Sequence, residues 1–529
     1  MVTAVEWITG ILGALASLVL YITWNDRKLR RVPDRIAKLS KRLTPESVRA
    51  DAKAYAEGPA KTIKSQLPDK TGRRYVVVGG GGFLGGWIIH QLLERGEDPE
   101  NIRVLDLNMT PANYIVADAK ERGLQYIKTD VTNPASVDEA FAHPWKNADK
   151  PITVFHTAAN IRFYELDPAF LPRSSKVNVD GVRNVIEASK RAGVDVFVHT
   201  SSASIGVHST RLLLWPWEKE PKRFVQVVSD KSAEPKTHWD HFSNYAVSKL
   251  EGENLVKSLD GTLVEGGKKM RTGSIRPGNG IFGPRGDMIC GGYLIRKTNP
   301  SWVHNSYSSF IYVENCALSH LHYERRLIDL VEGNRKDLPD IGGQFFNVRD
   351  PGPTPTYGDA YQTLETLTDG ECHFPVFSPT AMFLLAQIMG TYYVNQQRIA
   401  MRLPPSLHSI FTKIFPTIKG DLVNLQPSLF YLTSVHLIFD DSRARLSPEK
   451  GGLGYEGVWT TFEGLYNTWK EFDSGPYGKV NSRSAKAGIP LPDIFKKKKK
   501  TAAAAATNVV AEGINLPVTP MEEEVEPLA

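Results

Sequence analysis

Cysteine is scarce in this chain of 529 residues. Its three cysteines, Cys290, Cys316 and Cys372, are an odd number without metal-ligand spacing. They argue against a disulfide framework and favour a reducing compartment. The sequence also has no evident internal repeat and no nucleic-acid-binding motif. We therefore expect neither a metal site nor nucleic acid among the partners.

Charge of one sign is also limited, with a formal net charge of +6. Much of it comes from a basic cluster near the N-terminus and a lysine run at 496–500. This distribution favours contact with an anionic surface. The hydrophobic fraction of 41% and the charged fraction of 23% are typical of globular proteins, and the length suggests two or three domains.

Near the N-terminus lies an uncharged run, Trp7 to Trp24, whose 18 residues come close to spanning a bilayer as a helix. A signal peptide is disfavoured, because no Lys or Arg precedes the run and no small-x-small site follows it. A basic cluster follows instead: Arg27, Lys28, Arg30, Arg31, Arg35, Lys38, Lys41 and Arg42. The positive-inside rule predicts a single-pass anchor with the remainder in the cytosol; a buried or interfacial helix is the alternative.

From Arg74 onward, short apolar runs alternate with amphipathic helical patterns. This alternation predicts an α/β fold with a Rossmann-like, doubly wound parallel sheet. The helical patterns include 83–96 and 174–193. The expected strands are 75–79, 102–107, 124–130, 152–159, 196–202 and 271–277.

We expect five parts along the chain: a transmembrane anchor (1–25), a basic stalk (26–72), a dinucleotide-binding domain (73–285), a smaller substrate-binding region (286–473) and a disordered tail (474–529). Within the substrate-binding region, 375–431 is rich in apolar residues and is a candidate membrane-facing segment. Its run at 381–394, AMFLLAQIMGTYYV, is too short to span a membrane, so a buried or interfacial helix is expected.

The first expected strand runs into GGGGFLGG, in which Gly79, Gly82 and Gly85 allow a tight turn and close approach of a pyrophosphate. The helix that begins near Phe83 offers free N–H groups to the phosphates. Asp106 ends the second strand, 21 residues beyond Gly85. A carboxylate there binds both ribose hydroxyls and repels a 2′-phosphate, so NAD is favoured over NADP.

Further cofactor contacts are expected at the ends of the following strands. Asp130 ends the third strand and is the natural contact for the adenine. The remaining predicted cofactor positions are Phe83, Leu84, Val131, Thr157, Ala158 and Pro277.

The stretch SNYAVSKLEGE places Tyr245 and Lys249 four residues apart, on one face of a helix. The same spacing recurs at Tyr466 and Lys470, so spacing alone decides nothing. The position along the chain distinguishes the two pairs. Ser202 ends the fifth strand, and only Tyr245 and Lys249 lie on the helix between the fifth and the sixth strands. We therefore predict Tyr245 and Lys249 as the catalytic pair, with Ser202 beside them.

The ordered motifs GGGGFLG, VLDLN, VFHTAA, NVDGVRNV, VHTSSAS, NYAVSKLEGE, SIRPGNGIFGPRGD and FIYVENCALSHL resemble those of extended short-chain dehydrogenases/reductases. Within that superfamily the chain is similar to the 3β-hydroxysteroid dehydrogenase family, including its sterol-4α-carboxylate 3-dehydrogenases. The likeness covers about 73–330 and extends weakly to about 470. Val78 and Val182 stand at supporting positions where threonine is usual in the family.

The chemistry needs these residue types. Tyr245 is the expected base, Lys249 favours its phenolate and holds the nicotinamide ribose, and Ser202 orients the substrate oxygen. The resemblance also implies that Asn178 supports a water-linked proton relay. The resulting expectation is NAD-dependent oxidation of a 3β-hydroxyl on a sterol, steroid or triterpenoid, with decarboxylation where a 4α-carboxylate is present.

Two alternatives stay open. One keeps the fold and changes the substrate, as in a nucleotide-sugar epimerase or dehydratase or a reductase of polyketide or flavonoid-like ketones. The other is a non-catalytic NAD-binding membrane scaffold. The expected location is the endoplasmic reticulum membrane, with the catalytic domain facing the cytosol and its basic stalk near the anionic leaflet. A homodimer or a complex with other sterol enzymes is left open.

Overall fold

The computed structural model describes residues 3–475. The tail predicted at 474–529 lies almost entirely outside the described residues, so its expected disorder stays a prediction. All described residues belong to one compact unit of the chain.

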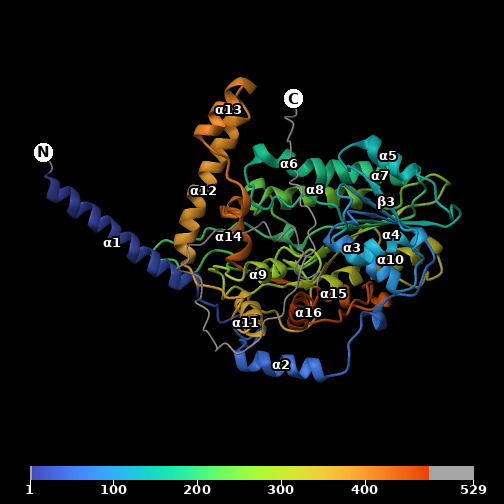
Figure 1. The fold of residues 1–529 in the computed structure, drawn as a ribbon, viewed down its shortest axis with the longest axis horizontal. Coiled ribbons are helices and arrows are strands. Elements are labelled where there is room, and N and C mark those ends of the chain that lie inside the picture. Colours follow the sequence, from blue (N-terminus) through green and yellow to red (C-terminus); the bar gives the residue numbers. More distant parts are fainter. Residues whose placement is uncertain (1–2, 476–529) are drawn as a thin grey trace, which may run out of the picture. The chain divides into compact units, whose positions relative to one another are not determined.

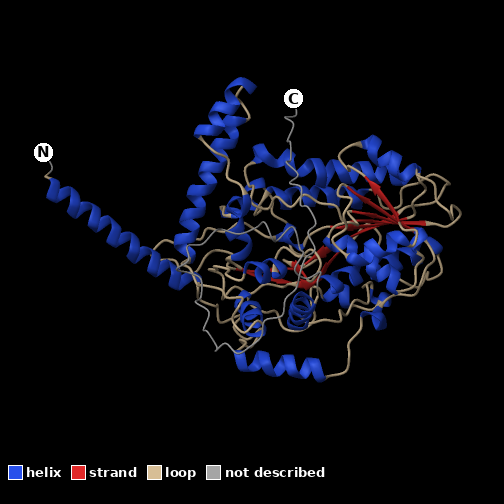
Figure 2. Cartoon of the chain, in the orientation of Figure 1, coloured by secondary structure: helices blue, strands red, loops and turns tan. Residues whose placement is uncertain are grey.

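Seven parallel strands form the central sheet, in the order β10-β7-β5-β4-β1-β2-β3 (Figure 2). From β1 the strands are added first toward β3 and then, from β4 onward, on the opposite side of β1. This change of order opens a crevice at the carboxyl ends of β1 and β4. The predicted doubly wound α/β fold is confirmed. The strands are β1 Arg74–Val78, β2 Ile102–Asp106, β3 Gln125–Lys128, β4 Ile152–His156, β5 Val196–Thr200, β7 Arg271–Pro277 and β10 Phe345–Val348.

Each of the six expected strands is present, and β7 has the predicted bounds. The other five end one to three residues earlier than predicted, because their last residues leave the ladder and enter the loops at the carboxyl edge of the sheet. The seventh strand, β10, was not predicted. It pairs with β7 from Ser274 to Pro277 and extends the sheet on that side.

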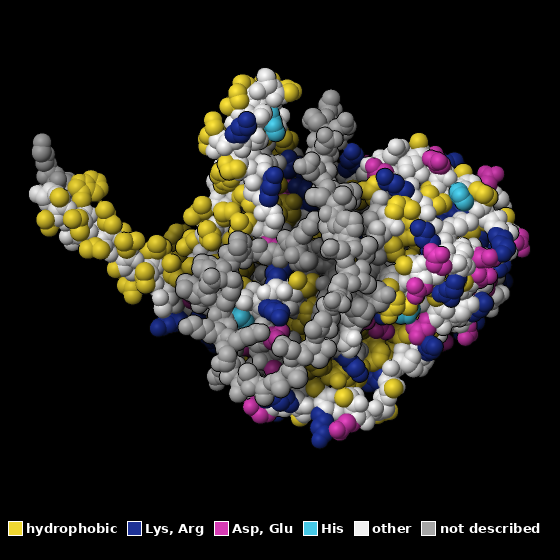
Figure 3. Space-filling view, viewed as in Figure 1, with side chains coloured by type: hydrophobic (Ala, Val, Ile, Leu, Met, Phe, Trp, Pro, Cys, Tyr) yellow, Lys and Arg dark blue, Asp and Glu magenta, His cyan; other side chains and the backbone are white. Residues whose placement is uncertain are grey.

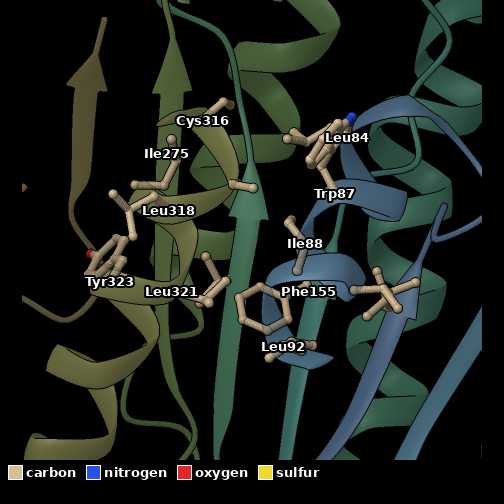
Figure 4. Close-up of a cluster of buried hydrophobic side chains, with 14 of the residues drawn as sticks. Leu84, Trp87, Ile88, Leu92, Phe155, Ile275, Cys316, Leu318, Leu321 and Tyr323 are labelled. Atoms are coloured by element: carbon tan, nitrogen blue, oxygen red, sulfur yellow. The ribbon is translucent and has the colours of Figure 1, made fainter. Parts of the chain in front are cut away.

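Helices cover both faces of the sheet (Figure 1). On one face, side chains of α3 and α10 meet Phe155 of β4 and Ile275 of β7 (Figure 4). The expulsion of water from such fully buried side chains contributes about 2 kcal/mol each. This face carries α3 Phe83–Glu94, α4 Tyr114–Glu121 and α10 Val313–Glu332; the other carries α5 Pro134–Ala142, α7 Val182–Arg191 and α8 Asn244–Ser258.

The helical pattern predicted at 174–193 is interrupted. The chain passes from α6 (Leu171–Ser175) through a π-helical segment, η4 (Lys176–Gly181), into α7. Such π segments are rare and often lie at functional sites. Asn178 lies inside this one.

The N-terminal helix α1 extends from Ala4 to Leu29, further than the predicted anchor. Within residues 3–475 it alone is long and apolar enough to cross a membrane, and its apolar stretch is exposed. The following segment, expected as a stalk, contains α2 (Pro45–Glu57) and η1 (Ile63–Gln66). It lies against the rest of the chain: the Tyr55 ring packs edge-on against Tyr466, with 5.2 Å between ring centroids.

The region after the sheet is mostly helical. Two short parallel pairs, β6 with β11 and β8 with β9, attach it to the sheet domain. The elements after β7 include β8 Ile281–Phe282, α9 Cys290–Arg296, β9 Ile311–Tyr312, α11 Tyr357–Leu367, η7 Gly420–Asn424, α14 Pro427–Thr433, β11 His436–Phe439, α15 Ser442–Arg445, η8 Pro448–Lys450 and α16 Thr461–Ser474. Short elements in the loops before β7 are η2 Pro99–Asn101, η3 Pro168–Phe170, η5 Ala203–Gly206, β6 Val225–Val228 and η6 His238–Asp240.

The run predicted as a short helix at 381–394 belongs to α12 (Pro379–Ala400), which is followed by α13 (Pro405–Ile414). One face of α12 packs through Phe383 and Ala386 against Phe430 of α14 and Leu29 of α1. The opposite face is exposed, as described below. The prediction of a helix is therefore confirmed, with a length of 22 residues.

Candidate active site

The glycine-rich turn between β1 and α3 leaves no room for side chains. Gly79 has φ +80°, and a Cβ there would lie 2.7 Å from the backbone nitrogen of Ala158. A Cβ on Gly85 would lie 2.4 Å from the carbonyl oxygen of Gly79. Gly82 caps α3 without a side-chain hydrogen bond. The first N–H groups of α3 thus face the crevice, where a phosphate can bind them.

The side chains of Phe83 and Leu84 pack into the core, so only their backbone N–H groups can serve a phosphate. Asp106 at the end of β2 accepts hydrogen bonds from the N–H of Gly81 at 3.0 Å and of Asn108 at 2.9 Å. These bonds fix its carboxylate beside the glycine turn. A cofactor with a 2′-phosphate would meet its negative charge there, so the geometry fits NAD.

The other predicted cofactor residues lie along the same edge of the sheet. The Asp130 carboxylate accepts hydrogen bonds from both the N–H and the hydroxyl of Thr132, each at 2.9 Å, so it is turned toward its own loop. The Val131 carbonyl accepts a hydrogen bond from Asn184 of α7. Thr157 donates to the Val78 carbonyl at 2.9 Å.

Ala158 lies against Gly79, and Pro277 ends β7, whose Ile275 carbonyl accepts a hydrogen bond from the N–H of Ser201. Their contribution to cofactor binding stays a prediction.

Tyr245 and Ser202 are brought together at the carboxyl end of β5. Burial raises the pKa of Tyr245 to about 12, while a hydrogen bond with the Ser202 hydroxyl acts in the opposite direction. Ser202 is held in place by the Ser204 hydroxyl at 2.7 Å and by its position as the N-cap of η5. The phenol and the hydroxyl together form a polar pair to which a substrate oxygen can bind.

Lys249 is almost fully buried, at 2% exposure, one helical turn beyond Tyr245. Burial lowers its pKa to about 8, and the charge of Glu253 partly opposes this. Its ammonium donates to the Thr200 carbonyl at 2.5 Å. The hydrogen bond that lowers the pKa of Tyr245 comes from Ser202, and activation of Tyr245 by Lys249 stays a prediction.

Asn178 is locked into the neighbouring π segment. Its amide donates to the Ser248 hydroxyl at 2.9 Å and to the Asn160 carbonyl at 3.0 Å, and its oxygen accepts from the Asn160 N–H at 2.8 Å. A Cβ on Gly252 of α8 would lie 2.3 Å from the Asn178 carbonyl oxygen. The glycine therefore lets α8 approach η4 closely, and Asn178 lies beside the turn of α8 that follows Lys249.

The second Tyr-x-x-x-Lys pair lies on α16, which packs against α9 and α11. The Tyr466 ring is 8% exposed and contacts Tyr55. Tyr466 is therefore a packing residue, away from the helix that carries Tyr245.

Sequence reasoning missed several residues that support the predicted ones. Asn160, Ser204 and Ser248 have no spacing signal and were found only through their hydrogen bonds. The buried His156 and His199 lie opposite each other on β4 and β5, with ring centroids 5.3 Å apart. The repeated strand ending VFHT and FVHT was a signal that could have drawn attention to them.

Behind the site, His320 of α10 supports the Thr200 side chain. Its Nδ1 lies 2.8 Å from the Cys316 carbonyl, which can only accept, so Nδ1 carries the proton in this contact. Its Nε2 then accepts from the Thr200 hydroxyl at 2.8 Å. Among residues 3–475, no group of three or more His, Cys, Asp or Glu side chains is placed to hold a metal ion.

The glycine turn and the Asp106 carboxylate fit a dinucleotide. A Cβ on Gly81 would lie 1.9 Å from the Tyr126 hydroxyl oxygen and 3.1 Å from the Asp106 carboxyl carbon, so the glycines keep open the space beside that carboxylate. A phenol, a serine and a buried lysine border the same crevice. The fold and the site define an NAD-dependent oxidoreductase of the extended short-chain dehydrogenase type.

Comparison with known proteins specifies the group. The model of the 3-beta hydroxysteroid dehydrogenase/isomerase family matches residues 76–371. The chain belongs to this family.

Two relatives illustrate the range of similarity. Human 3 beta-hydroxysteroid dehydrogenase type 7 is 30% identical over 295 residues, which cover 54% of this chain and 70% of that protein. The decarboxylating sterol-4-alpha-carboxylate 3-dehydrogenase of Schizosaccharomyces pombe is 28% identical over 276 residues, 51% of this chain and 68% of that protein.

Solved structures support the fold. A UDP-glucose-4-epimerase from Stenotrophomonas maltophila, crystallised with NAD and formylated UDP-arabinopyranose, superposes with a TM-score of 0.50 at 15% identity. The match covers 78% of this chain and all of that one. At this identity the likeness concerns the fold alone.

Proposed function

We propose that this protein oxidises the 3β-hydroxyl of a sterol-like lipid with NAD as hydride acceptor. Where the substrate carries a 4α-carboxylate, decarboxylation follows. The observation that carries the proposal is the contact of Tyr245 with Ser202, beside a buried lysine, in a chain that belongs to the 3-beta hydroxysteroid dehydrogenase/isomerase family. The name of the fission yeast relative supports the carboxylated substrate.

In this mechanism the substrate hydroxyl binds between Tyr245 and Ser202. Ser202 donates to the substrate oxygen and fixes its direction. Tyr245, as phenolate, takes the hydroxyl proton while the C3–H bond breaks. Bound NAD would supply the hydride acceptor for C3, and the glycine turn and Asp106 would hold it. The products are a ketone, NADH and a protonated Tyr245, which balances atoms and electrons.

The high pKa of Tyr245 means that the phenolate must be stabilised when the enzyme is loaded. A cationic nicotinamide ring and the ammonium of Lys249 would both do so. Lys249 would also hold the ribose, and Asn178 would support a water-linked proton relay. We therefore propose Tyr245, Lys249, Ser202 and Asn178 as the catalytic set.

A 4α-carboxylate becomes a β-keto acid once C3 is a ketone. The C4–carboxyl bond then breaks, carbon dioxide leaves, and the electron pair passes to the ketone as an enolate. Protonation at C4 gives the demethylated ketone. This step needs no further redox partner.

We also propose that α1 anchors the protein in the endoplasmic reticulum membrane, with the catalytic part in the cytosol. The exposed apolar surface of α1 and the basic residues after it support this orientation.

The test is to incubate the purified protein in vesicles with NAD and a panel of 3β-hydroxysteroids, with and without a 4α-carboxylate. NADH formation on 3β-hydroxysteroids is expected, with equimolar carbon dioxide from the carboxylated ones. Turnover of a nucleotide sugar without net NADH would favour an epimerase instead. NAD binding with no turnover of any substrate would favour the scaffold alternative.

A further inference from the structure

The inner end of α1 is fixed to the catalytic part of the chain by hydrogen bonds. The Tyr21 hydroxyl donates to the Leu214 carbonyl at 3.1 Å. The Asn25 amide donates to the Leu212 carbonyl at 3.1 Å, and its oxygen accepts from the Leu214 N–H at 3.2 Å. Asn25 is fully buried. The loop at 212–214 is therefore held at the level of the last turns of α1's uncharged run.

The start of α12 is fixed at the same level. The Thr380 N–H donates to the Asp26 carboxylate at 2.9 Å, and the Thr380 hydroxyl accepts from the Asn25 amide at 2.9 Å. Leu29 packs beside Phe383 in one apolar cluster. If α1 spans a bilayer with Trp24 at its surface, α12 and the 212–214 loop must begin at that surface.

Two exposed tryptophans lie directly beyond this loop. Trp215 and Trp217 are stacked, with ring centroids 5.4 Å apart, and are 56% and 75% exposed. Tryptophan is enriched at the interface between lipid and water, where its amphipathic ring is favoured. Trp215 directly follows Leu214, which is hydrogen-bonded to Tyr21 and Asn25 of α1.

Apolar side chains also cover the exposed faces of α12 and α13. On α13, Leu407, Ile410 and Ile414 repeat at helical spacing and are 49%, 57% and 65% exposed. Figure 3 shows hydrophobic side chains gathered along α1 and over α12 and α13. The docking surface is defined as Trp215, Trp217, Leu385, Ile388, Ile399, Leu407, Ile410 and Ile414.

The charge of this region suits an anionic membrane. No Asp or Glu occurs between Glu371 and Asp421, whereas Arg398, Arg402, Lys413 and Lys419 do. Basic residues near an anionic leaflet strengthen membrane binding by electrostatic attraction. Apolar side chains flanked by bases are the composition of a helix that lies in a membrane surface.

A pocket of about 410 Å³ lies between α12, α14 and the loop at 209–213. It is lined by Leu212, Phe383 and Tyr431, among others. Leu212 and Phe383 belong to the cluster that includes Leu29 of α1. Tyr431 packs against that cluster and also against the one that contacts Tyr245. The pocket thus adjoins both the base of α1 and the surroundings of the catalytic tyrosine.

We propose that the docking surface lies in the lipid bilayer beside α1, and that the pocket admits the lipid substrate from the bilayer toward Tyr245. The inference rests on the proposed function, since it supposes an apolar substrate dissolved in a membrane. Its occupant is bilayer lipid, which would cover the apolar faces of α12 and α13 that the described chain leaves open.

Depth measurements on the full-length protein test the docking surface. The native cysteines are buried, so single introduced cysteines can be labelled selectively. Variants W217C and I410C, and L263C as a control whose 68% exposure lies between theirs, would carry an environment-sensitive fluorophore. In vesicles of phosphatidylcholine and phosphatidylserine, quenching by spin-labelled lipid should be at least about threefold stronger at 217 and 410 than at 263.

A fourth label, at L15C in α1, separates the two hypotheses. Quenching at 15 with water-like emission at 217 and 410 would keep the anchor and overturn the docking surface. Quenching at 217 and 410 alone would refute both the proposed anchor and the placement of the docking surface beside α1. Neither result depends on turnover, so failure of the proposed activity remains a separate finding.

The route of the substrate needs a second variant. Gln387 lines the pocket, and Q387W would fill part of it. We expect the apparent KM for a vesicle-borne 3β-hydroxysteroid to rise about tenfold, while the affinity for NAD measured by fluorescence titration is kept. An unchanged KM would show that the pocket is not on the substrate's path. Absence of turnover in the unmodified protein would instead refute the proposed function.

Discussion

The sheet domain buries its apolar side chains, whereas the region of α1, α12 and α13 leaves many of them exposed. In the sheet domain the central strands β1, β4 and β5 are almost entirely buried, and buried charges are paired: Arg276 with Glu253, and Arg73 with Asp195. On α12 and α13, Ile388 and Ile414 remain 67% and 65% exposed. The first region buries its apolar side chains, whereas the second exposes an apolar surface of the kind that marks an interaction site.

We expect the two regions to serve different steps, hydride transfer and access of the substrate. Hydride transfer should depend on the sheet domain alone, because every predicted catalytic side chain lies there. Access of a membrane-dissolved substrate should depend on the second region. Changes in one region should therefore affect turnover, and changes in the other should affect the apparent affinity for substrate in vesicles.

The largest expected effect is in the sheet domain. Replacing Tyr245 by Phe removes the proposed base, and we expect kcat to fall about a thousandfold with little change in stability. The matched control is Tyr466→Phe, which removes the hydroxyl from the second Tyr-x-x-x-Lys pair and should keep activity. Steady-state NADH formation and thermal unfolding measure both. Full activity in the Tyr245→Phe protein would refute the mechanism.

The second largest expected effect is on the preference for NAD over NADP. Asp106→Asn removes the charge that repels a 2′-phosphate but keeps a group able to bind a ribose hydroxyl. We expect the ratio of kcat/KM for NAD to that for NADP to fall about 10- to 100-fold. Asp130→Asn is the control, since the Asp130 carboxylate is bonded to Thr132 and should leave the ratio nearly unchanged. An unaltered ratio in Asp106→Asn would place NAD selection elsewhere.

Asp350, which follows β10 and contacts α10 and α16, should make the stability of the protein depend on pH. Burial raises the pKa of Asp350 to about 7, although its carboxylate accepts hydrogen bonds from the Tyr312 N–H, Asn315 and Thr461. A carboxyl whose pKa is higher in the folded than in the unfolded chain stabilises the fold below the unfolded value, near 4. That stabilisation is lost as the pH rises through about 7.

We therefore expect the free energy of unfolding to decrease from pH 4 to pH 7, by up to about 1.4 kcal/mol per unit for this one group. Burial also raises the pKa of Glu314 to about 7, and this group should contribute in the same direction. Asp350→Asn should flatten the dependence, as followed by urea unfolding at several pH values. A slope identical to that of the unmodified protein would show that Asp350 does not titrate in this range.

The smallest effect is expected where the two regions join. Asn25→Ala removes hydrogen bonds to Leu212, Leu214 and Thr380, which should loosen α1 from the catalytic part. We expect the apparent KM for a vesicle-borne steroid to rise several-fold, with kcat for steroid supplied in cyclodextrin kept. Thr23→Ala, on an exposed position of the same helix, is the control. Equal kinetics in both variants would show that the attachment of α1 is not needed for access.

The sequence was sufficient for much of the sheet domain because its signals are local. Apolar runs such as Val76–Val78 identify buried strands, and the glycines from Gly79 to Gly85 mark a turn that side chains would block. The order of these elements also separated Tyr245 from Tyr466. The strand β10 escaped prediction because its four residues carry too short a pattern to be distinguished from a loop.

The sequence by itself determined the class of fold, the dinucleotide turn and the choice of Tyr245, because each depends on residues close together in the chain or on the order of strands. Only the tertiary structure decided that Ser248 and Asn160 hold Asn178, that His320 supports Thr200, and that Asn25 fixes α1 to Leu212 and Thr380. Those contacts join residues from 18 to 355 positions apart. No periodicity encodes such pairs, since they arise only when packed elements bring distant side chains within hydrogen-bonding distance.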